Sequence, residues 1–247
     1  MGDFFQIYDT LAAGVAPGHT VTGTLADPCW TAVETAFSFG IAMTTPGDTI
    51  PPQISTSYIG MELRDLAVAA KSWNLSEASY GVAAMNAFYN TPQHLDALHG
   101  ALEFDLYCTH GLDLQGKRIG VVGHLNMPDF VREQASELLI LERDPRPGDY
   151  PDSACEWILP TCDIVLITGS TLVNKTLPRL LQLCEQACTI LTGPTVPLCP
   201  ALLELGIDRI AGLVITDRAG MTHKIQNSLF GPPYSHGQSF LLTRDNL

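Results

Sequence analysis

The chain has 247 residues, of which 46% are hydrophobic and 16% charged, a composition that fits a well-packed globular protein and excludes a disordered one. The formal net charge is −13 and no basic run or basic stripe is present, so nucleic acid and anionic membrane surfaces are excluded as expected partners. No apolar run reaches the roughly eighteen residues of a membrane span, and the N-terminus lacks the regions of a signal peptide.

The first hundred residues predict a small α+β domain. Strands are expected at 20–25 and 30–39, and a turn-rich stretch follows them, with Pro46-Gly47-Asp48 and Pro51-Pro52. Helices are expected at 61–70 and 77–88, the first because apolar residues recur there at helical spacing. We place this domain at residues 1–100.

From Lys117 onward the pattern alternates between strands and helices. Continuous apolar runs predict strands at 118–122, 137–141, 164–168, 189–192 and 209–215. Helices are expected between them, at 128–135, 153–159, 177–188 and 200–205. The predicted fold class is therefore α/β, with a Rossmann-like doubly wound parallel sheet over residues 101–247. Residues 101–116 are expected to form a linker helix and turn.

Ligands of an open parallel sheet bind beyond the carboxyl ends of its strands. Five polar loops follow the predicted strand ends, at 123–126, 142–145, 168–171, 193–195 and 216–218. Because these ends share one edge of the sheet, we expect the loops to lie together and to form the ligand site.

The first of these loops does not carry a dinucleotide fingerprint. Gly120 and Gly123 are three residues apart, and Asn126 stands where a third glycine is required. Glu142 nevertheless ends the second strand, where an acidic residue would bind a ribose hydroxyl. Two interpretations stay open: a nucleotide or S-adenosylmethionine site, or a simple turn at Gly123 with a solvated Glu142.

The loop Thr168-Gly169-Ser170-Thr171 is a candidate anion site. It follows an apolar strand, and Asn174 or Thr176 is expected to cap the long helix after it. Its hydroxyls and N–H groups could hold a carboxylate, phosphate or sulfonate. An ordinary capped helix start explains the same residues.

Metal ligation has less support in the sequence. Cys184 and Cys188 are four residues apart on a predicted helix, a spacing that chelates less often than it packs, and neither CxxC nor HExxH occurs. His124 is the best single metal or acid–base candidate, although a hydrogen-bonded loop histidine is the simpler interpretation. Seven cysteines without disulfide-like clustering indicate reduced thiols and a cytoplasmic location.

The predicted helix at 77–88 carries small residues at Gly81, Ala83, Ala84 and Ala87, which allow close packing. Asn86 lies among them and needs hydrogen-bond partners if it is buried. We expect it to reach the loops of the second domain. Helices of this kind also suggest a homodimer.

Segments from both halves, in order, resemble one family. These segments are 73–87, 120–123, 142–145, 168–176 and 193–194. They resemble the "putative heavy-metal chelation" family, of the domain of unknown function 364 type with a DUF4213-type first module. The resemblance covers nearly the whole chain and implies an enolase N-terminal-like α+β domain before the Rossmann-like domain. Enolase chemistry does not transfer, because the enolase barrel is missing.

The resemblance also implies a cleft between the two domains that binds a metal or a metal-binding small molecule. His124 lies beside the matched positions and is not carried over as a required ligand. The matched positions expected to line the cleft are Asn86, Gly123, Glu142, Thr168, Gly169, Ser170, Asn174, Gly193 and Pro194.

Two functions are compatible with these residues, and a structural subunit with a vestigial crevice is a third possibility. The first is a cytoplasmic protein that binds a small anionic or metal-chelating ligand, with a transition metal or a chelating small molecule as the cofactor to look for. The second is a transferase or lyase with a nucleotide-type cofactor, such as S-adenosylmethionine, over Gly123 and with His124 as acid–base group.

Overall fold

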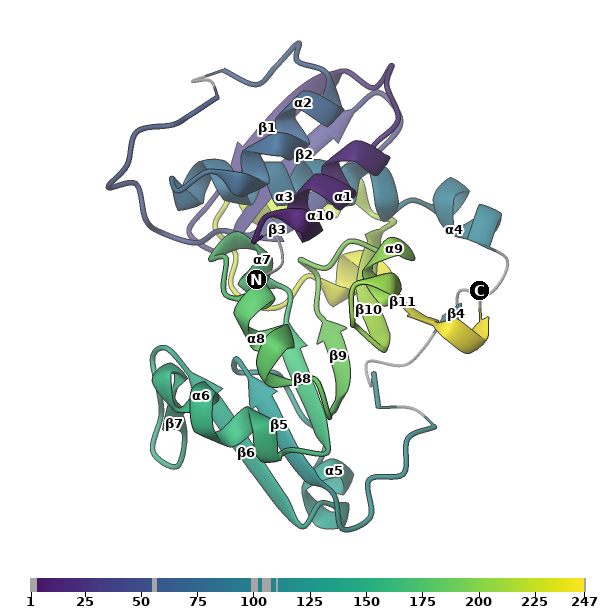
Figure 1. Ribbon diagram of the computed structural model, residues 1–247. Helices are drawn as coiled ribbons and strands as arrows, with labels where there is room; N and C mark the ends of the chain where they lie inside the picture. The colour runs from purple at the N-terminus through teal and green to yellow at the C-terminus, as the bar shows by residue number, and fades with distance from the viewer. Residues whose placement is uncertain (1–3, 55–56, 99–101, 104–107, 110, 247) are drawn as a thin grey trace.

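The computed structural model describes residues 4–54, 57–98, 102–103, 108–109 and 111–246. Two β-sheets organise this part of the chain, a small antiparallel sheet from the first half and a large, mostly parallel sheet from the second (Figure 1). The predicted α/β class is confirmed in this form.

The small sheet contains β1 (Val21–Ala26), β2 (Trp30–Thr35) and β3 (Phe39–Met43), paired in that order. The prediction of a single strand over 30–39 is wrong, because the chain reverses between β2 and β3. The Thr35 hydroxyl accepts hydrogen bonds from the N–H groups of Phe37 and Ser38 and stabilises this turn. Both faces of the hairpin are buried, which hid the reversal in one apolar run.

The helices of the first half are α1 (Gln6–Gly14), α2 (Leu63–Ala67), α3 (Leu75–Tyr89) and α4 (Pro92–Leu98). Helix α3 begins after Asn74, whose side chain accepts a hydrogen bond from Glu77 N at 2.8 Å. It packs on β2 and β3. A Cβ atom added to Gly40 would lie 2.0 Å from the Ala87 nitrogen, so the expected close packing of the small residues is confirmed.

The large sheet has the order β4-β11-β10-β9-β8-β5-β6-β7. From β7 to β10 neighbouring strands are parallel, and numbered along the chain these six follow the order 3-2-1-4-5-6 of a Rossmann sheet. Strand β11 pairs antiparallel with β10, and β4 pairs antiparallel with β11. The strands are β4 (Leu102–Glu103), β5 (Arg118–Val122), β6 (Glu137–Glu142), β7 (Tyr150–Pro151), β8 (Ile164–Thr168), β9 (Cys188–Thr192), β10 (Arg209–Ile215) and β11 (Gly237–Thr243).

Helices cover both faces of the large sheet. On one face, Val131 of α5 (Asp129–Gln134) packs among Ile119 and Leu166. The opposite face is covered by α6 (Cys155–Ile158), α7 (Ser170–Val173), α8 (Leu177–Leu183) and α9 (Ala201–Glu204). This arrangement is doubly wound, as expected for a sheet with continuous apolar strands.

Two further predictions about the second half need correction, and two of its elements were not predicted. The helix predicted over 177–188 ends at Leu183, and Cys188 begins β9, so Cys184 and Cys188 do not share a helix face. Neither α10 (Arg218–Gln226) nor β11 was predicted. The linker predicted over 101–116 contains β4, and its residues 101, 104–107 and 110 lie outside the described part of the chain.

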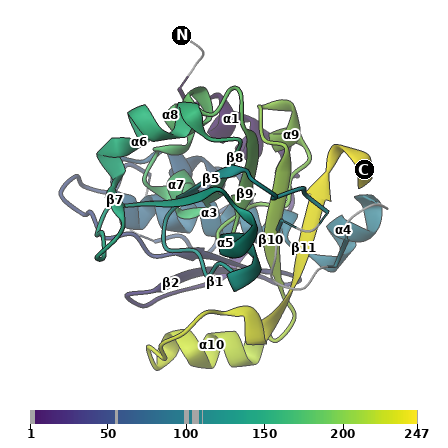
Figure 2. The same ribbon diagram turned by 90° about the horizontal axis from the view of Figure 1, so that it is seen from below.

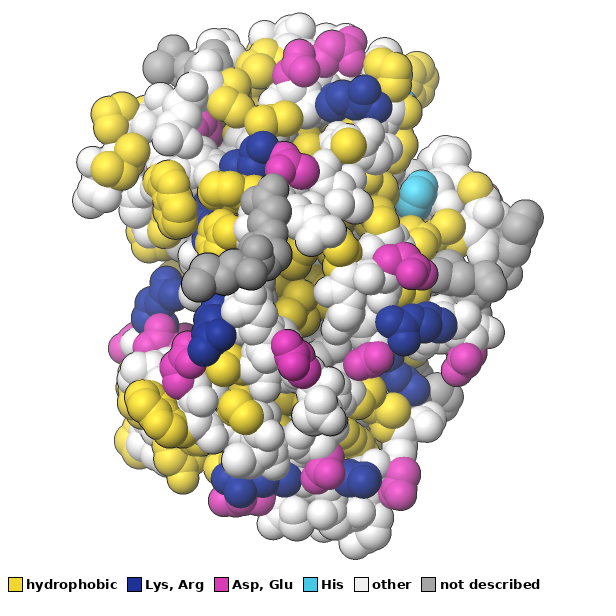
Figure 3. All heavy atoms as spheres, in the orientation of Figure 1, with side chains coloured by type: hydrophobic (Ala, Val, Ile, Leu, Met, Phe, Trp, Pro, Cys, Tyr) yellow, Lys and Arg dark blue, Asp and Glu magenta, His cyan; other side chains and the backbone are white. Residues whose placement is uncertain are grey.

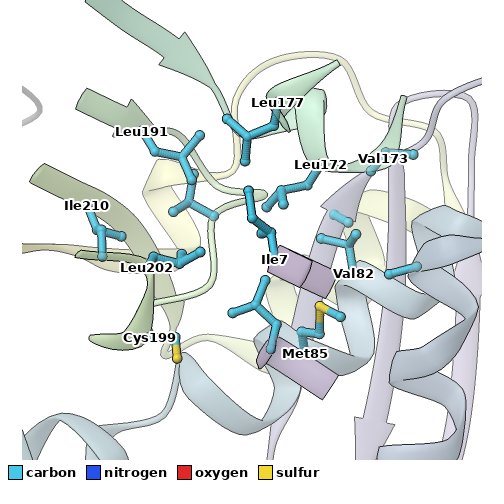
Figure 4. Packing of buried hydrophobic residues seen from close by; sticks show 14 of the residues in the cluster. Ile7, Val82, Met85, Leu172, Val173, Leu177, Leu191, Cys199, Leu202 and Ile210 are labelled. Carbon is cyan, nitrogen blue, oxygen red and sulfur yellow. The ribbon is translucent and has the colours of Figure 1, made fainter. Parts of the chain in front are cut away.

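The two halves share their hydrophobic cores. Figure 4 shows Ile7 of α1, Val82 and Met85 of α3 and Leu172 of α7 converging with Leu202 of α9, and all belong to one buried cluster. A second cluster joins Trp30 and Ile41 of the small sheet to residues of β10 and α10. Helix α10 also packs on β1, below the small sheet in Figure 2. The two halves on either side of the predicted domain boundary at residue 100 therefore pack against each other through shared hydrophobic clusters.

Candidate functional site

A pocket of about 640 Å³ lies where the two sheets meet. The large sheet contributes loops after β5, β8 and β9, and the small sheet contributes residues at the ends of β2 and β3. A further wall comes from the chain between α10 and β11. The lining residues are Pro28, Cys29, Trp30, Met43, Thr44, Cys108, Thr109, His124, Leu125, Asn126, Met127, Pro128, Leu166, Thr168, Gly169, Thr192, Gly193, Pro194, Thr195, Gly231, Pro232, Pro233 and Tyr234.

The pocket lies at the topological switch point of the parallel sheet. The chain leaves β5 toward β6 on one side, while β8 lies on the other side, so the loops after β5 and β8 separate here. Gly123 makes the turn after β5 with φ +99°. An added Cβ there would lie 2.8 Å from Thr168 Cγ2, so a glycine is required both for the backbone conformation and for the close approach to β8.

The described residues that line the pocket include no Lys, Arg, Asp or Glu. Most are apolar, and the polar ones are chiefly threonines. The Thr195 hydroxyl accepts a hydrogen bond from Met43 N at 2.9 Å and so ties the two sheets together inside the pocket wall. Thr44 Oγ1 lies 2.8 Å from Thr31 Oγ1.

His124 lines the pocket, and its ring is held by two carboxylates. Its Nε2 lies 2.6 Å from Asp149 Oδ2, and its Nδ1 lies 3.5 Å from Glu142 Oε2. The hydrogen bond from His124 holds the pKa of Asp149 below its usual value, with help from the Arg146 N–H. The imidazole therefore links the loop after β5 to the end of β6 and to the loop between β6 and β7. Both of its ring nitrogens face these carboxylates.

Five of the residues proposed from the sequence line this pocket, namely His124, Thr168, Gly169, Gly193 and Pro194. They come from three different strand ends. The convergence of these loops follows from the parallel topology.

The other five proposed residues lie outside the pocket lining. Gly123 lies behind Thr168, as described above. Glu142 accepts hydrogen bonds from the N–H groups of His124 and Arg143, so its carboxylate faces the backbone of the adjacent loops. Ser170 donates to Thr168 Oγ1 at 3.3 Å.

Asn174 does not cap α8 with its side chain; its Oδ1 accepts hydrogen bonds from the backbone N and the hydroxyl of Thr176. Asn86 is buried on α3 and donates to Ile41 O at 2.7 Å and to Pro194 O at 3.5 Å. As expected, it reaches a loop of the second half. Its Oδ1 has no hydrogen-bond partner among the described residues.

Sequence reasoning missed the small-sheet wall and the wall formed by Gly231–Tyr234. The run Gly231-Pro232-Pro233 is a turn signal, but nothing in the sequence places it beside the ends of β8 and β9. The buried Lys224 holds this segment, because its Nζ donates to Leu229 O and Phe230 O at 2.7 and 2.9 Å.

Thr109 and Tyr234 form another part of the wall. Thr109 is 4% exposed, and its hydroxyl has no hydrogen-bond partner among the described residues. Burial raises the pKa of Tyr234, so its phenol stays protonated near neutral pH. Burial also raises the pKa of the neighbouring Cys108 thiol.

The described residues do not fit a metal site made by the protein alone. Cys29, Cys108 and His124 line the pocket, but no three His, Cys, Asp or Glu side chains in the described ranges are grouped so that they could hold a metal ion. Burial also raises the pKa of the thiols of Cys155 and Cys184, to about 11 and about 12, which disfavours the thiolate form that binds metals.

A second, more open groove of about 1200 Å³ lies between α1 and α8. Cys188, at the start of β9, lines it, whereas Thr192, at the end of β9, lines the switch-point pocket. The groove therefore lies toward the amino ends of the strands, opposite to where parallel sheets bind ligands.

On the face shown in Figure 3, basic and acidic side chains are interspersed.

Fold and pocket together define an α/β protein with a Rossmann-ordered sheet and a pocket at its switch point. The chain belongs to the DUF364 family, described as "Putative heavy-metal chelation", whose model matches residues 109–241. Residues 8–89 match the DUF4213 model, which carries the same description.

Relatives with solved structures carry the same fold. A DUF364 protein of unknown function from Desulfitobacterium hafniense is 35% identical and has a TM-score of 0.87, with 98% of each chain covered. A DUF364 protein from Pyrococcus horikoshii is 26% identical with a TM-score of 0.79, over 98% of this chain and all of that one. The uncharacterized protein MJ0500 of Methanocaldococcus jannaschii is 31% identical over 168 residues, 64% of this chain and 62% of its own length.

Within the described ranges, no helix combines the length and apolar character needed to cross a bilayer.

Proposed function

We propose that this protein binds a small organic molecule in the switch-point pocket. The observation that carries the proposal is the pocket of about 640 Å³ at the carboxyl edge of the parallel sheet, with walls from both halves of the chain. Ligand pockets of proteins are commonly about 300–1,000 Å³ and mostly apolar, with a few polar groups.

A metal, if one is carried, would enter with donor atoms supplied by the organic molecule. The described residues offer single donors in the pocket wall and no group of three. A chelating small molecule with its own ligand atoms is compatible with this wall, whereas a free metal ion finds an incomplete site.

The alternative, an enzyme with a nucleotide-type cofactor, draws on the Rossmann strand order and the turn at Gly123. It has less support, because Glu142 already accepts two backbone N–H groups and both nitrogens of His124 face carboxylates. A stabilisation by millimolar S-adenosylmethionine, NAD or ATP would favour the enzyme; a bound ligand at a hundredfold its Kd adds about 2.7 kcal/mol.

The experiment compares a pocket-filling variant with a matched control. Thr44→Trp places an indole in the pocket wall, and Thr22→Trp places the same side chain on the exposed part of β1 outside it. Saturation-transfer NMR with a fragment library, and native mass spectrometry of each protein as purified, report what binds. We expect binding to wild type and Thr22→Trp and its loss in Thr44→Trp; equal binding by the two variants contradicts the proposal.

A further inference from the structure

The first observation is the absence of fixed charge around the pocket. Its lining, within the described part of the chain, contains no Lys, Arg, Asp or Glu. The ring of His124 offers no free positive charge to a ligand, because its two nitrogens lie 2.6 and 3.5 Å from the carboxylates of Asp149 and Glu142. An anionic ligand would therefore lose its water without gaining a counter-charge, and burial of an unpaired charge is strongly unfavourable.

The second observation is the number of rigid rings in the apolar wall. It includes the indole of Trp30, the phenol ring of Tyr234 and five prolines. Proline side chains are rigid, and the two aromatic rings add flat faces against which a planar ligand can stack. The prolines are Pro28, Pro128, Pro194, Pro232 and Pro233.

The third observation is one unsatisfied hydroxyl. Thr109 is the only lining residue, among those described, with a buried side-chain polar atom that lacks a hydrogen bond. By contrast, Thr195 and Thr44 have partners within the protein. Buried hydroxyls in folded proteins almost always have a partner, so a ligand group that supplies one is the simplest completion of this wall.

We infer that the pocket takes an uncharged, planar heteroaromatic molecule, and that the Thr109 hydroxyl makes a hydrogen bond to its polar edge. The inference rests on the proposed function and names its ligand class. A hydroxyl both donates and accepts, so a ring carbonyl, ring nitrogen or amide N–H on the ligand would serve equally.

The charge part of the inference is tested with probes that share a ring and differ by a charge. Suitable pairs are riboflavin with flavin mononucleotide, and nicotinamide with nicotinate; zinc and nickel ions are titrated separately. Saturation-transfer NMR and fluorescence titrations compare wild type, Thr44→Trp and Thr22→Trp. We expect a neutral member to bind at least about tenfold more tightly than its charged relative, with binding lost only in Thr44→Trp.

Each other outcome has a distinct meaning. Tighter binding of the charged members, binding of the free metal ions alone, or no binding of any neutral heterocycle overturns the inference. If probes bind but Thr44→Trp and Thr22→Trp bind them equally, the proposed function itself fails, because the molecules are held elsewhere.

The role of Thr109 is tested with Thr109→Val, which keeps the side-chain shape and removes the hydroxyl. Affinity for the neutral probes should fall about 3- to 10-fold, the effect of one hydrogen bond. The Tm of the free protein should not fall, because the hydroxyl has no partner to lose there, and Thr109→Ser should restore affinity. A lowered Tm with unchanged affinity would assign Thr109 a structural role and contradict the inference.

Discussion

The side chain of Asn90, just after α3, is bonded to the backbone of Leu198, far along the chain in the second half. Asn90 Oδ1 accepts a hydrogen bond from Leu198 N at 2.8 Å, and its Nδ2 donates to Val196 O and Leu213 O at 2.9 and 3.1 Å. One buried amide thus attaches the loop after β9 to β10 and to α3. That loop supplies Pro194 and Thr195 to the pocket.

Asn90→Ala should therefore destabilise the protein strongly. The substitution leaves the buried backbone groups of Val196, Leu198 and Leu213 without these partners, and we expect a loss of about 3 kcal/mol in the free energy of unfolding. Urea denaturation measures it. Asn86→Ala, one helical turn earlier, is the matched control and should cost less, because Asn86 makes one short hydrogen bond and one of 3.5 Å. Equal losses would contradict the assigned role of Asn90.

Asp149→Asn should change the response of stability to acid. The hydrogen bond from His124 lowers the folded-state pKa of Asp149, so the folded state binds fewer protons than the unfolded state between the two pKa values. This contribution is present above about pH 4, the ordinary Asp value, and is lost as the pH falls through the lower folded pKa.

The measurement is urea denaturation of wild type and Asp149→Asn at pH 7, 5, 4 and 3. The free energy of unfolding of wild type should exceed that of the variant at pH 7, and this difference should disappear at the lowest pH. A constant difference between the two across the series would show that the His124–Asp149 bond has no linked protonation.

Lys224→Met should loosen the wall of the pocket without removing a lining residue. Its Nζ holds the carbonyls of Leu229 and Phe230 just before Gly231, and the methionine keeps most of the buried stem. We expect faster amide exchange at 229–234 and about a fivefold loss of affinity for pocket probes. The control variant Lys117→Met, at an exposed lysine, should change neither the exchange nor the affinity. Unchanged exchange at 229–234 would argue against this support role.

Lys175→Met should reveal an alkaline titration. Burial lowers the pKa of Lys175 to about 8, partly opposed by Glu77, whereas an unfolded lysine titrates near about 10.4. Between these values the unfolded state binds more protons, so the stability of wild type relative to Lys175→Met should rise from pH 7.5 to 10. Denaturation curves over this range provide the check, and parallel curves for the two proteins would contradict it.

Local sequence signals located the parallel strands well. The predicted strands at 118–122, 164–168 and 209–215 coincide with β5, β8 and β10. Each is a short apolar run bounded by polar or turn-forming residues, and both of its faces are buried, so no competing periodicity obscures it.

The elements that were missed depend on packing rather than on local pattern. Helix α10 is mostly polar and has no clear apolar periodicity. It is held in place because Met221 and Ile225 pack with Ile41 of the small sheet. Gly40 carries no local strand signal, yet it is the residue that admits the backbone of α3 against β3. Contacts of this kind join segments that are distant in sequence, which a local pattern does not reveal.

The candidate site likewise combines features that local sequence predicts with features that depend on tertiary packing. The parallel sheet, its carboxyl edge and the loops at that edge could be predicted from local pattern, because apolar strands and glycine turns are encoded over a few residues. Which side chains face the pocket depends on how the two halves pack: Glu142 faces the backbone of its neighbours, whereas Trp30, Thr109 and Tyr234 line the pocket. Side-chain direction at a loop depends on partners elsewhere in the chain, and those partners meet only when the two sheets pack.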